Sequence, residues 1–249
     1  MNNKILFVEE GHNTSYINSL LIGLFYNSSI ISTKLLDADP INSHFIYLQE
    51  IIKNNFVEPI RKNISITANV TNEIRNFCCF SGFSKNITEK HNVIDYLDFI
   101  VENVSPISLI GPHIHINLEK SEDNADIKTL LKKRMSESFT KEKHNMHNIY
   151  MVPIYIDRFF YGTKTNVKID IKRKIMLDES NYRWNIHCII CHNGKNLIDG
   201  YYYAIIFVNN KWIIFDDTRV PSFENIDMTN TCTVEKIMSE CILVIYKMI

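Results

Sequence analysis

Two segments far apart in the chain carry the residue types of a hydrolytic site. The first reads GHNTSYINSLL from residue 11, and it places Ser15 at the start of an apolar pattern with helical spacing. A nucleophile in the first turn of a helix gains from the partial positive charge of the helix N-terminus. A hydroxyl is too weak an acid for this charge alone to ionise it, so Ser15 would need an adjacent general base.

The second segment reads CHNG at 191–194, GYY at 200–202 and WIIFDD at 212–217. Asn209 and Asn210 separate two apolar runs and tolerate the positive φ of a hairpin turn, so the pattern predicts two paired strands. Both segments also have a simpler interpretation. Thr14 or Ser15 would cap the helix by accepting a hydrogen bond from a backbone amide, and the three tyrosines at 201–203 would form an ordinary aromatic strand.

Together the two segments resemble the Cys box and the His box of the ubiquitin-specific proteases, which read roughly G-N-T-C-Y-x-N-S and H-x-G…G-H-Y…W-x-x-F-D-D. By this resemblance Ser15 stands at the position of the nucleophilic cysteine, and Tyr201 at that of the catalytic histidine. Asp216 keeps the carboxylate that orients the histidine in the family. Glu10 replaces the Asn or Gln that donates to the oxyanion, so the resemblance implies a protease scaffold without its catalytic groups.

These replacements remove the chemistry of the site. A phenol ordinarily ionises near pH 10, so a tyrosine is a poor base at neutral pH. A carboxylate at Glu10 has no proton to donate and would repel an oxyanion. Losing one oxyanion donor costs about 100- to 1,000-fold in rate, and losing the nucleophile or the base costs about a millionfold. We therefore expect an inactive site.

Two other groups near the second segment have alternative interpretations. His192 matches the upstream histidine of the His box, and it could replace the base only if the hairpin folded differently. Cys188 and Cys191 form the one Cys-x-x-Cys of the sequence, next to His187 and His192. Neighbouring side chains of a strand point to opposite faces, and no second ligand pair follows. We expect buried thiols and no metal or other cofactor.

The resemblance extends from about residue 6 to residue 248. HNVIDYL from residue 91 is similar to the family's Q-D-A-x-E-F-L box, whose acids meet the arginines of the ubiquitin tail, and Asp95 keeps one carboxylate. By position, the cleft that binds this tail would include Asp95, His192, Gly200 and Tyr202. His91 and Asn92 replace the Gln and the Asp of that box, so ubiquitin binding should be weak.

Three further segments resemble parts of the family fold. These are PIYIDRF from residue 153, the segment 167–177 and CILVIY from residue 241, which are similar to strands of the palm. Most family members also carry zinc-binding fingers with two Cys-x-x-Cys pairs. Between residues 135 and 150 this chain has a short polar stretch with His144 and His147, which implies reduced fingers without zinc.

Periodicity gives the element order independently of the resemblance. Helical spacing predicts helices over 15–26, 43–55, 92–102 and 126–135. Alternation and β-branched residues predict strands over 149–160, 167–171, 184–190, 202–208, 212–215 and 241–246. Helices followed by antiparallel strands indicate an α+β fold.

Composition excludes several classes. The 249 residues carry 27 basic and 28 acidic side chains, so the chain has no excess of positive charge with which to bind nucleic acid. No apolar stretch approaches the length that spans a bilayer, and the first ten residues do not form a signal peptide. Six cysteines without small-domain spacing indicate an intracellular, cytoplasmic protein. The abundance of Asn, Ile and Lys is typical of AT-rich genomes, such as those of large DNA viruses.

The sequence thus predicts an α+β, papain-like cysteine protease fold of the ubiquitin-specific protease type. A helical thumb would span 5–105, and an antiparallel β palm with reduced fingers would span 106–249. The expected function is that of an inactive relative that binds a protein: ubiquitin, a ubiquitin-like protein or another partner, but neither nucleic acid nor membrane. Two alternatives remain open. The chain could be a structural or assembly subunit, such as a viral core component, or a weak hydrolase that uses Ser15.

Overall fold

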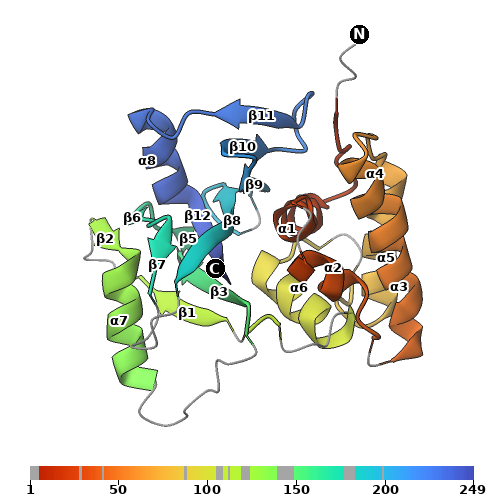
Figure 1. Cartoon of the computed structure of the whole chain (residues 1–249), viewed down its shortest axis with the longest axis horizontal. Coiled ribbons are helices and arrows are strands. Elements are labelled where there is room, and N and C mark those ends of the chain that lie inside the picture. Colours follow the sequence, from red (N-terminus) through yellow and green to blue (C-terminus); the bar gives the residue numbers. More distant parts are fainter. Residues whose placement is uncertain are drawn as a thin grey trace. The chain divides into compact units, whose positions relative to one another are not determined.

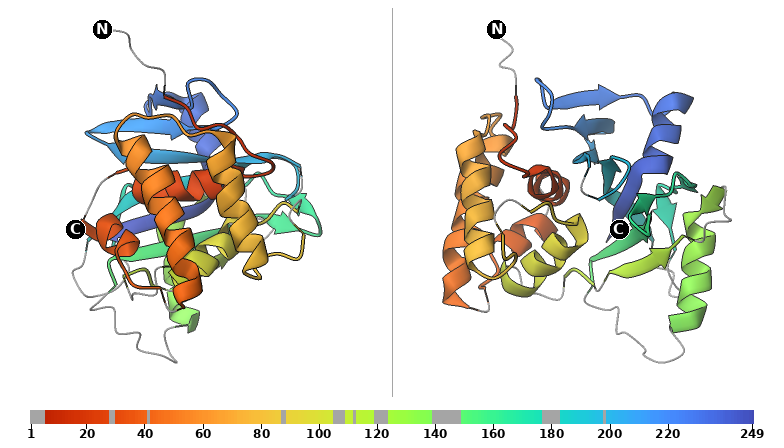
Figure 2. Two further views of the ribbon diagram at one scale, coloured as in Figure 1. Left: turned by 90° about the vertical axis from the view of Figure 1, so that its right-hand side faces the viewer. Right: turned by 180° about the vertical axis from the view of Figure 1, so that it is seen from behind.

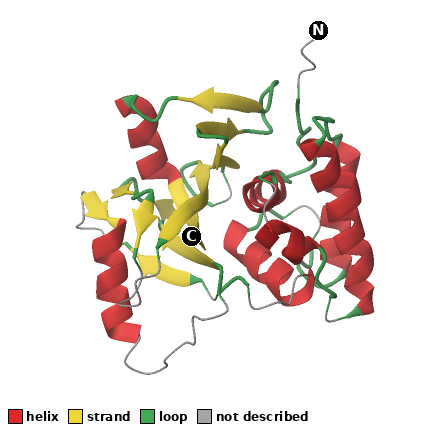
Figure 3. Cartoon of the chain, viewed as in Figure 1, coloured by secondary structure: helices red, strands yellow, loops and turns green. Residues whose placement is uncertain are grey.

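The structure is a computed structural model that describes residues 6–27, 30–40, 42–86, 89–104, 109–111, 113–118, 124–138, 149–176, 183–197 and 199–249 (Figure 1). By internal contacts the chain divides into two compact units. Unit one comprises Met1–Ile107 and Tyr201–Ile226, and unit two comprises Ser108–Gly200 and Asp227–Ile249. Figure 3 shows that helices predominate in the first unit and strands in the second. His144 and His147 lie outside the described residues.

Unit one combines helices with a small sheet. Its helical elements are α1 (Ser15–Phe25), α2 (Ile30–Leu36), the 3₁₀ segment η1 (Ser43–Phe45), α3 (Ile46–Glu50), the π-helical segment η2 (Ile51–Val57), α4 (Glu58–Arg61), α5 (Ala68–Phe80), α6 (Val93–Phe99) and the π-helical segment η3 (Ile100–Val104). Its strands are β9 (Tyr201–Val208), β10 (Lys211–Phe215) and β11 (Phe223–Ile226).

Helix α1 is the centre of unit one. All eleven of its residues are buried. It packs against α2, α5, α6, η2 and β9, and the views of Figure 2 show the neighbouring helices alongside it. The helices expected over 15–26 and 92–102 are confirmed. The helix expected over 43–55 is observed as a continuous series of 3₁₀, α and π turns from Ser43 to Val57.

The sheet of unit one is an antiparallel meander. In β9 and β10, Ile206 pairs with Ile213 and Ala204 with Phe215. The turn between them is formed by Asn209 and Asn210, which have φ values of 50° and 62°. The hairpin predicted from these two asparagines is therefore confirmed. Strand β11 continues the meander on the other edge of β10.

Unit two is built on a sheet in the order β1-β3-β12-β8, to which β7 adds on β8. Its elements are β1 (Ile114–Asn117), β2 (Asn124–Asp126), α7 (Ile127–Ser138), β3 (Met151–Asp157), β4 (Phe159–Phe160), β5 (Thr163–Lys164), β6 (Lys168–Asp170), β7 (Lys174–Ile175), β8 (Trp184–Asn193), α8 (Thr231–Glu240) and β12 (Cys241–Met248). Strand β12 lies between β3 and β8, antiparallel to both, and its first six residues are buried.

Most pairings of unit two are antiparallel, as expected for an α+β fold, but two are not. Strand β1 runs parallel to β3, and β2 runs parallel to β6. The helix expected over 126–135 is confirmed as α7. Among the described residues, no helix combines the length and the apolar character needed to cross a bilayer.

The prediction of a single strand over 149–160 is wrong, because the strand is interrupted at Arg158. Strand β3 ends at Asp157, whose Oδ1 accepts a hydrogen bond from the backbone N–H of Phe159 at 3.1 Å, and β4 begins at Phe159. The Arg158 side chain is fully buried, and its guanidinium donates to main-chain carbonyls of several segments. A buried arginine is thus what interrupts the apolar run.

Candidate active site

The loop before α1 sets the position of Ser15. Asn13 has a φ of 55°, and the Gly11 N–H donates to Thr14 Oγ1 at 2.8 Å. Helix α5 holds the loop from the side: Asn72 Oδ1 accepts from the His12 N–H at 2.8 Å, and Arg75 donates to the His12 carbonyl. A Cβ on Gly11 would lie 2.5 Å from Asn72 Oδ1, so this close approach requires glycine.

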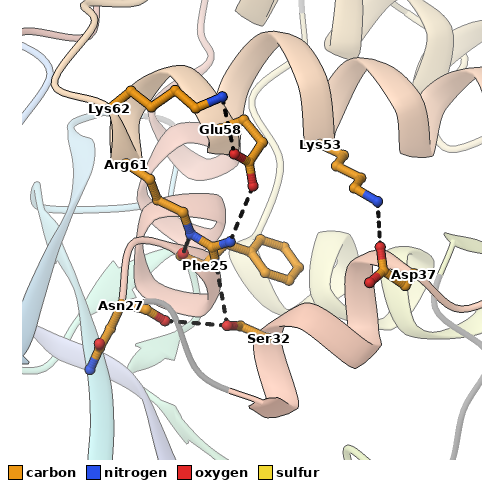
Figure 4. A network of polar contacts seen from close by, with 8 residues as sticks. All are labelled: Phe25, Asn27, Ser32, Asp37, Lys53, Glu58, Arg61 and Lys62. Carbon is orange, nitrogen blue, oxygen red and sulfur yellow. Dashed lines mark hydrogen bonds and ion pairs between the residues drawn. The ribbon is translucent and has the colours of Figure 1, made fainter.

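A polar network fixes the other end of α1 (Figure 4). Arg61 Nε donates to the Phe25 carbonyl at 3.0 Å, and Arg61 donates a second bond to Ser32 Oγ at 3.1 Å. Its third nitrogen lies 3.6 Å from Glu58 Oε1. The arginine thereby donates to a carbonyl at the end of the helix that has no hydrogen-bond partner within the helix. Helix α1 is therefore held at both ends.

Ser15 is the first residue of α1, and it is buried. Its Oγ accepts a hydrogen bond from the backbone N–H of Tyr202 at 3.2 Å. The helix has no side-chain capping bond at Thr14, so the interpretation of Thr14 or Ser15 as a cap is wrong. The serine hydroxyl instead joins α1 to β9.

The hairpin brings Tyr201 and Asp216 together. Tyr201 begins β9, and Asp216 directly follows β10. The Tyr201 hydroxyl donates to Asp216 Oδ2 at 3.4 Å. Asp216 is 1% exposed. The structure thus gathers the residues at positions 15, 201, 202 and 216 within one unit, as the sequence predicts. The roles assigned to them remain a proposal.

A second carboxylate, which the sequence analysis did not single out, lies next to this group. Asp217 is buried, and its Oδ2 accepts from Asn18 Nδ2 at 2.7 Å. Asn18 lies one turn along α1 from Ser15, and the same amide nitrogen lies 3.4 Å from Thr14 Oγ1. Burial raises the pKa of Asp217 to about 7, and the charges of Glu10 and Asp216 act in the same direction. The Asn18 bond opposes this increase.

Glu10 lies on the exposed loop before α1. Partial desolvation of its carboxyl is the largest cause that raises its pKa, and Lys90 opposes it. The charge of Asp216 raises the pKa further, whereas that of His12 lowers it. Glu10 therefore shares the electrostatic surroundings of Asp216 and Asp217, and its assignment to the oxyanion position remains a proposal.

The other predicted site residues lie on different elements. Asp95 is exposed on α6. Tyr202 is buried on β9. His192 belongs to unit two, where it is fully buried near the end of β8 with its ring centroid 5.3 Å from that of Phe159. Gly200 has a φ of 125°, and an added Cβ would lie 2.0 Å from the Asn193 carbonyl oxygen, so this turn requires glycine.

The structure groups no set of three His, Cys, Asp or Glu side chains for a metal ion, within the residues that it describes. Cys188 and Cys191 are both buried on β8, in agreement with their interpretation as apolar thiols. Burial also raises the pKa of the Cys188 thiol well above its ordinary value.

Ser15 thus lies at the start of a buried helix, bonded to an antiparallel hairpin that carries Tyr201 and leads into Asp216. The family model described as ubiquitin carboxyl-terminal hydrolase matches residues 9–239, and this chain belongs to that family. The expected family and its papain-like α+β fold are thereby confirmed. A comparison with curated protein sequences found no match.

Asp217 predicts a pH dependence of stability. The folded chain keeps a proton on Asp217 up to about pH 7, whereas the unfolded chain releases it near pH 4. The folded state therefore binds more protons in this window, and the free energy of unfolding falls as pH rises through it. Between about pH 5 and about pH 8 the expected loss is about 2 to 3 kcal/mol.

Urea denaturation of the natural chain and of Asp217→Asn at both pH values measures this loss. The variant keeps an acceptor for Asn18 and should lose this part of the pH dependence. The exposed Asp39 of the same unit provides the matched control, because Asp39→Asn should keep the natural slope. Equal slopes in all three proteins would contradict an elevated pKa at Asp217.

Proposed function

We propose that this chain is a catalytically inactive member of the ubiquitin hydrolase family that acts by binding a protein. Ubiquitin or a ubiquitin-like protein is the partner that the family favours. The observation that carries the proposal is the hydrogen bond at position 201, where a phenol donates to Asp216. The base that should remove a proton from residue 15 is replaced by a phenol, which has no basic nitrogen to take up that proton.

A histidine would make a hydrogen bond of the same direction, so the chemical identity of the donor is what matters. An orienting carboxylate accepts from the base and thereby stabilises the base after it has taken up a proton. A neutral phenol in the same place cannot take up a second proton near neutral pH. Ser15 Oγ accepts from the Tyr202 N–H, which does not activate a hydroxyl for attack. Neither partner of the catalytic pair can therefore form an attacking anion.

The oxyanion position supports the same proposal. Glu10 presents a carboxyl whose raised pKa arises from desolvation and from the neighbouring negative charge of Asp216. In its ionised form it repels the oxyanion of a tetrahedral intermediate. Loss of one oxyanion donor alone costs about 100- to 1,000-fold. Three groups of the site are altered, at positions 10, 15 and 201. The simplest account is that the chain has lost hydrolytic activity and has kept the fold.

Binding can outlast catalysis, because the two depend on different residues. Asp95 is exposed on α6, at the position whose carboxylate in the family meets the arginines of a ubiquitin tail. Because His91 and Asn92 replace two residues of the tail-reading box, the affinity for ubiquitin should be weak, with a Kd of about 100 µM or higher.

We further propose that the chain has a thumb over 5–105 and a palm over 106–249 with reduced fingers. We also propose that it uses no cofactor and that it is located in the cytoplasm.

Titration of isotope-labelled ubiquitin with the chain, followed by NMR, tests the binding. We expect shifts that concentrate in the C-terminal tail and vanish for ubiquitin lacking that tail. Asp95→Asn should weaken binding about two- to fivefold, the usual effect of an exposed ion pair. The control Asp39→Asn should not. Unchanged ubiquitin spectra at high concentration would reject ubiquitin as the partner and favour the structural-subunit alternative.

A further inference from the structure

The carboxylate of Asp216 has several polar partners besides the residue at position 201. Thr218 donates to Oδ1 twice, from its backbone N–H at 3.0 Å and from its hydroxyl at 2.6 Å. On Oδ2, Arg219 Nε lies at 2.9 Å and the Tyr201 hydroxyl at 3.4 Å. Four donors therefore converge on one carboxylate that is almost completely buried.

Arg219 is the strongest of these partners. It forms an ion pair with Asp216, and its N–O distance is 0.5 Å shorter than that of the hydrogen bond from Tyr201. A second guanidinium nitrogen lies 3.6 Å from Glu224 Oε2, so the side chain is held between two carboxylates. The tyrosine occupies the longer, weaker position on the same oxygen.

The backbone of the turn reinforces this arrangement. The Arg219 N–H donates to the Asp216 carbonyl at 3.2 Å, and the Asp216 N–H donates to the Ser222 carbonyl at 2.9 Å. Ser222 Oγ donates to the Arg219 carbonyl at 3.0 Å. These bonds keep Arg219 three residues beyond Asp216 and close to its carboxylate. The guanidinium is about half exposed, so its removal creates no large cavity.

An orienting acid stabilises a protonated base through its negative charge. Arg219 shares Oδ2 with the residue at position 201 and compensates that charge. Its positive charge therefore opposes a protonated imidazole at position 201. A like charge within about 4–6 Å disfavours the charged form by one or more pKa units.

We propose that Arg219 is a positioning residue that weakens the coupling between Asp216 and position 201 and so acts as a further cause of inactivity, beside Ser15, Tyr201 and Glu10. The inference rests on the proposed loss of catalysis. It adds that an imidazole restored at position 201 is only weakly coupled to Asp216 while the guanidinium is present.

The test compares Tyr201→His with the double variant Tyr201→His/Arg219→Gln, using NMR titration of the introduced imidazole. We expect Arg219→Gln to raise the pKa of that imidazole by at least about one unit, because the positive charge beside Asp216 is then removed. Tyr201→His/Lys211→Gln removes a positive charge from the same hairpin and is the control. It should shift the pKa by less than about 0.3 unit.

An imidazole pKa that Arg219→Gln leaves unchanged would overturn the proposal. If the double variant does not fold, Tyr201→His/Arg219→Met retains the aliphatic stem, and the same shift is expected. A structural role of Arg219 alone would lower the melting temperature without moving the imidazole pKa. This readout does not depend on turnover, so the proposal can fail while the natural chain proves inactive, and it can hold if the chain proves active.

Discussion

Restoring the family's catalytic groups should raise hydrolysis of a ubiquitin–fluorophore conjugate at least about a thousandfold over the natural chain. The restored variant combines Ser15→Cys, Tyr201→His, Glu10→Asn and Arg219→Gln. A thiol at the start of α1 gains from the helix terminus in a way that a hydroxyl cannot. Asparagine supplies the oxyanion donor, and Asp216 becomes available to the new imidazole.

The matched control is the same variant with Tyr201 retained. Without a base it should remain within about tenfold of the natural chain, because the base and the nucleophile act as one unit. Initial rates at equal enzyme concentration, with circular dichroism to verify folding, provide the measurement. A restored variant no faster than this control would mean that the site no longer accepts a ubiquitin tail.

Arg158→Met should destabilise unit two by about 5 kcal/mol or more. The guanidinium donates to the carbonyls of Cys241, Val167 and Met238 at 2.6, 2.6 and 2.7 Å, and it lies 3.4 Å from the Thr165 carbonyl. Methionine fills similar space but leaves these carbonyls without donors. Each unsatisfied buried acceptor costs about 1 to 3 kcal/mol.

Chemical denaturation of Arg158→Met against the natural chain gives this difference. Arg173→Met replaces an exposed arginine of the same unit and should change the free energy of unfolding by no more than about 0.5 kcal/mol. Arg158→Lys should fall between the two, because an ammonium has three donors at a single point. A loss below about 1 kcal/mol for Arg158→Met would show that these hydrogen bonds contribute little.

The sequence predicts those elements whose signal is local. Helix α1 follows from apolar spacing, and the β9–β10 hairpin follows from two asparagines that accept a positive φ. Helix α5 was not predicted, because polar residues lie on its buried face. Thr71 and Arg75 are buried beside Ile74 and Cys78, so polar side chains interrupt the apolar residues on that face.

At the candidate site, too, the sequence predicts only what a local or family pattern indicates. The resemblance identifies positions 15, 201 and 216, because their order along the chain is a family pattern. The bond between Asn18 and Asp217 joins residues 199 positions apart, so spacing alone gives no indication of it. Arg219 had a usable signal: an arginine three residues after an aspartate in a turn can close back on its carboxylate. The buried Arg158 had none, because its acceptors are main-chain carbonyls that every residue possesses.

The loss of a nucleophile-generating pair is tested most directly by the rate of fluorophore release from ubiquitin–rhodamine by the natural chain and by Ser15→Ala. Both proteins at high concentration should match the rate in buffer alone, because the Ser15 hydroxyl is not deprotonated at neutral pH. Release by the natural chain that Ser15→Ala abolishes would show an attacking hydroxyl at this site and would contradict the account.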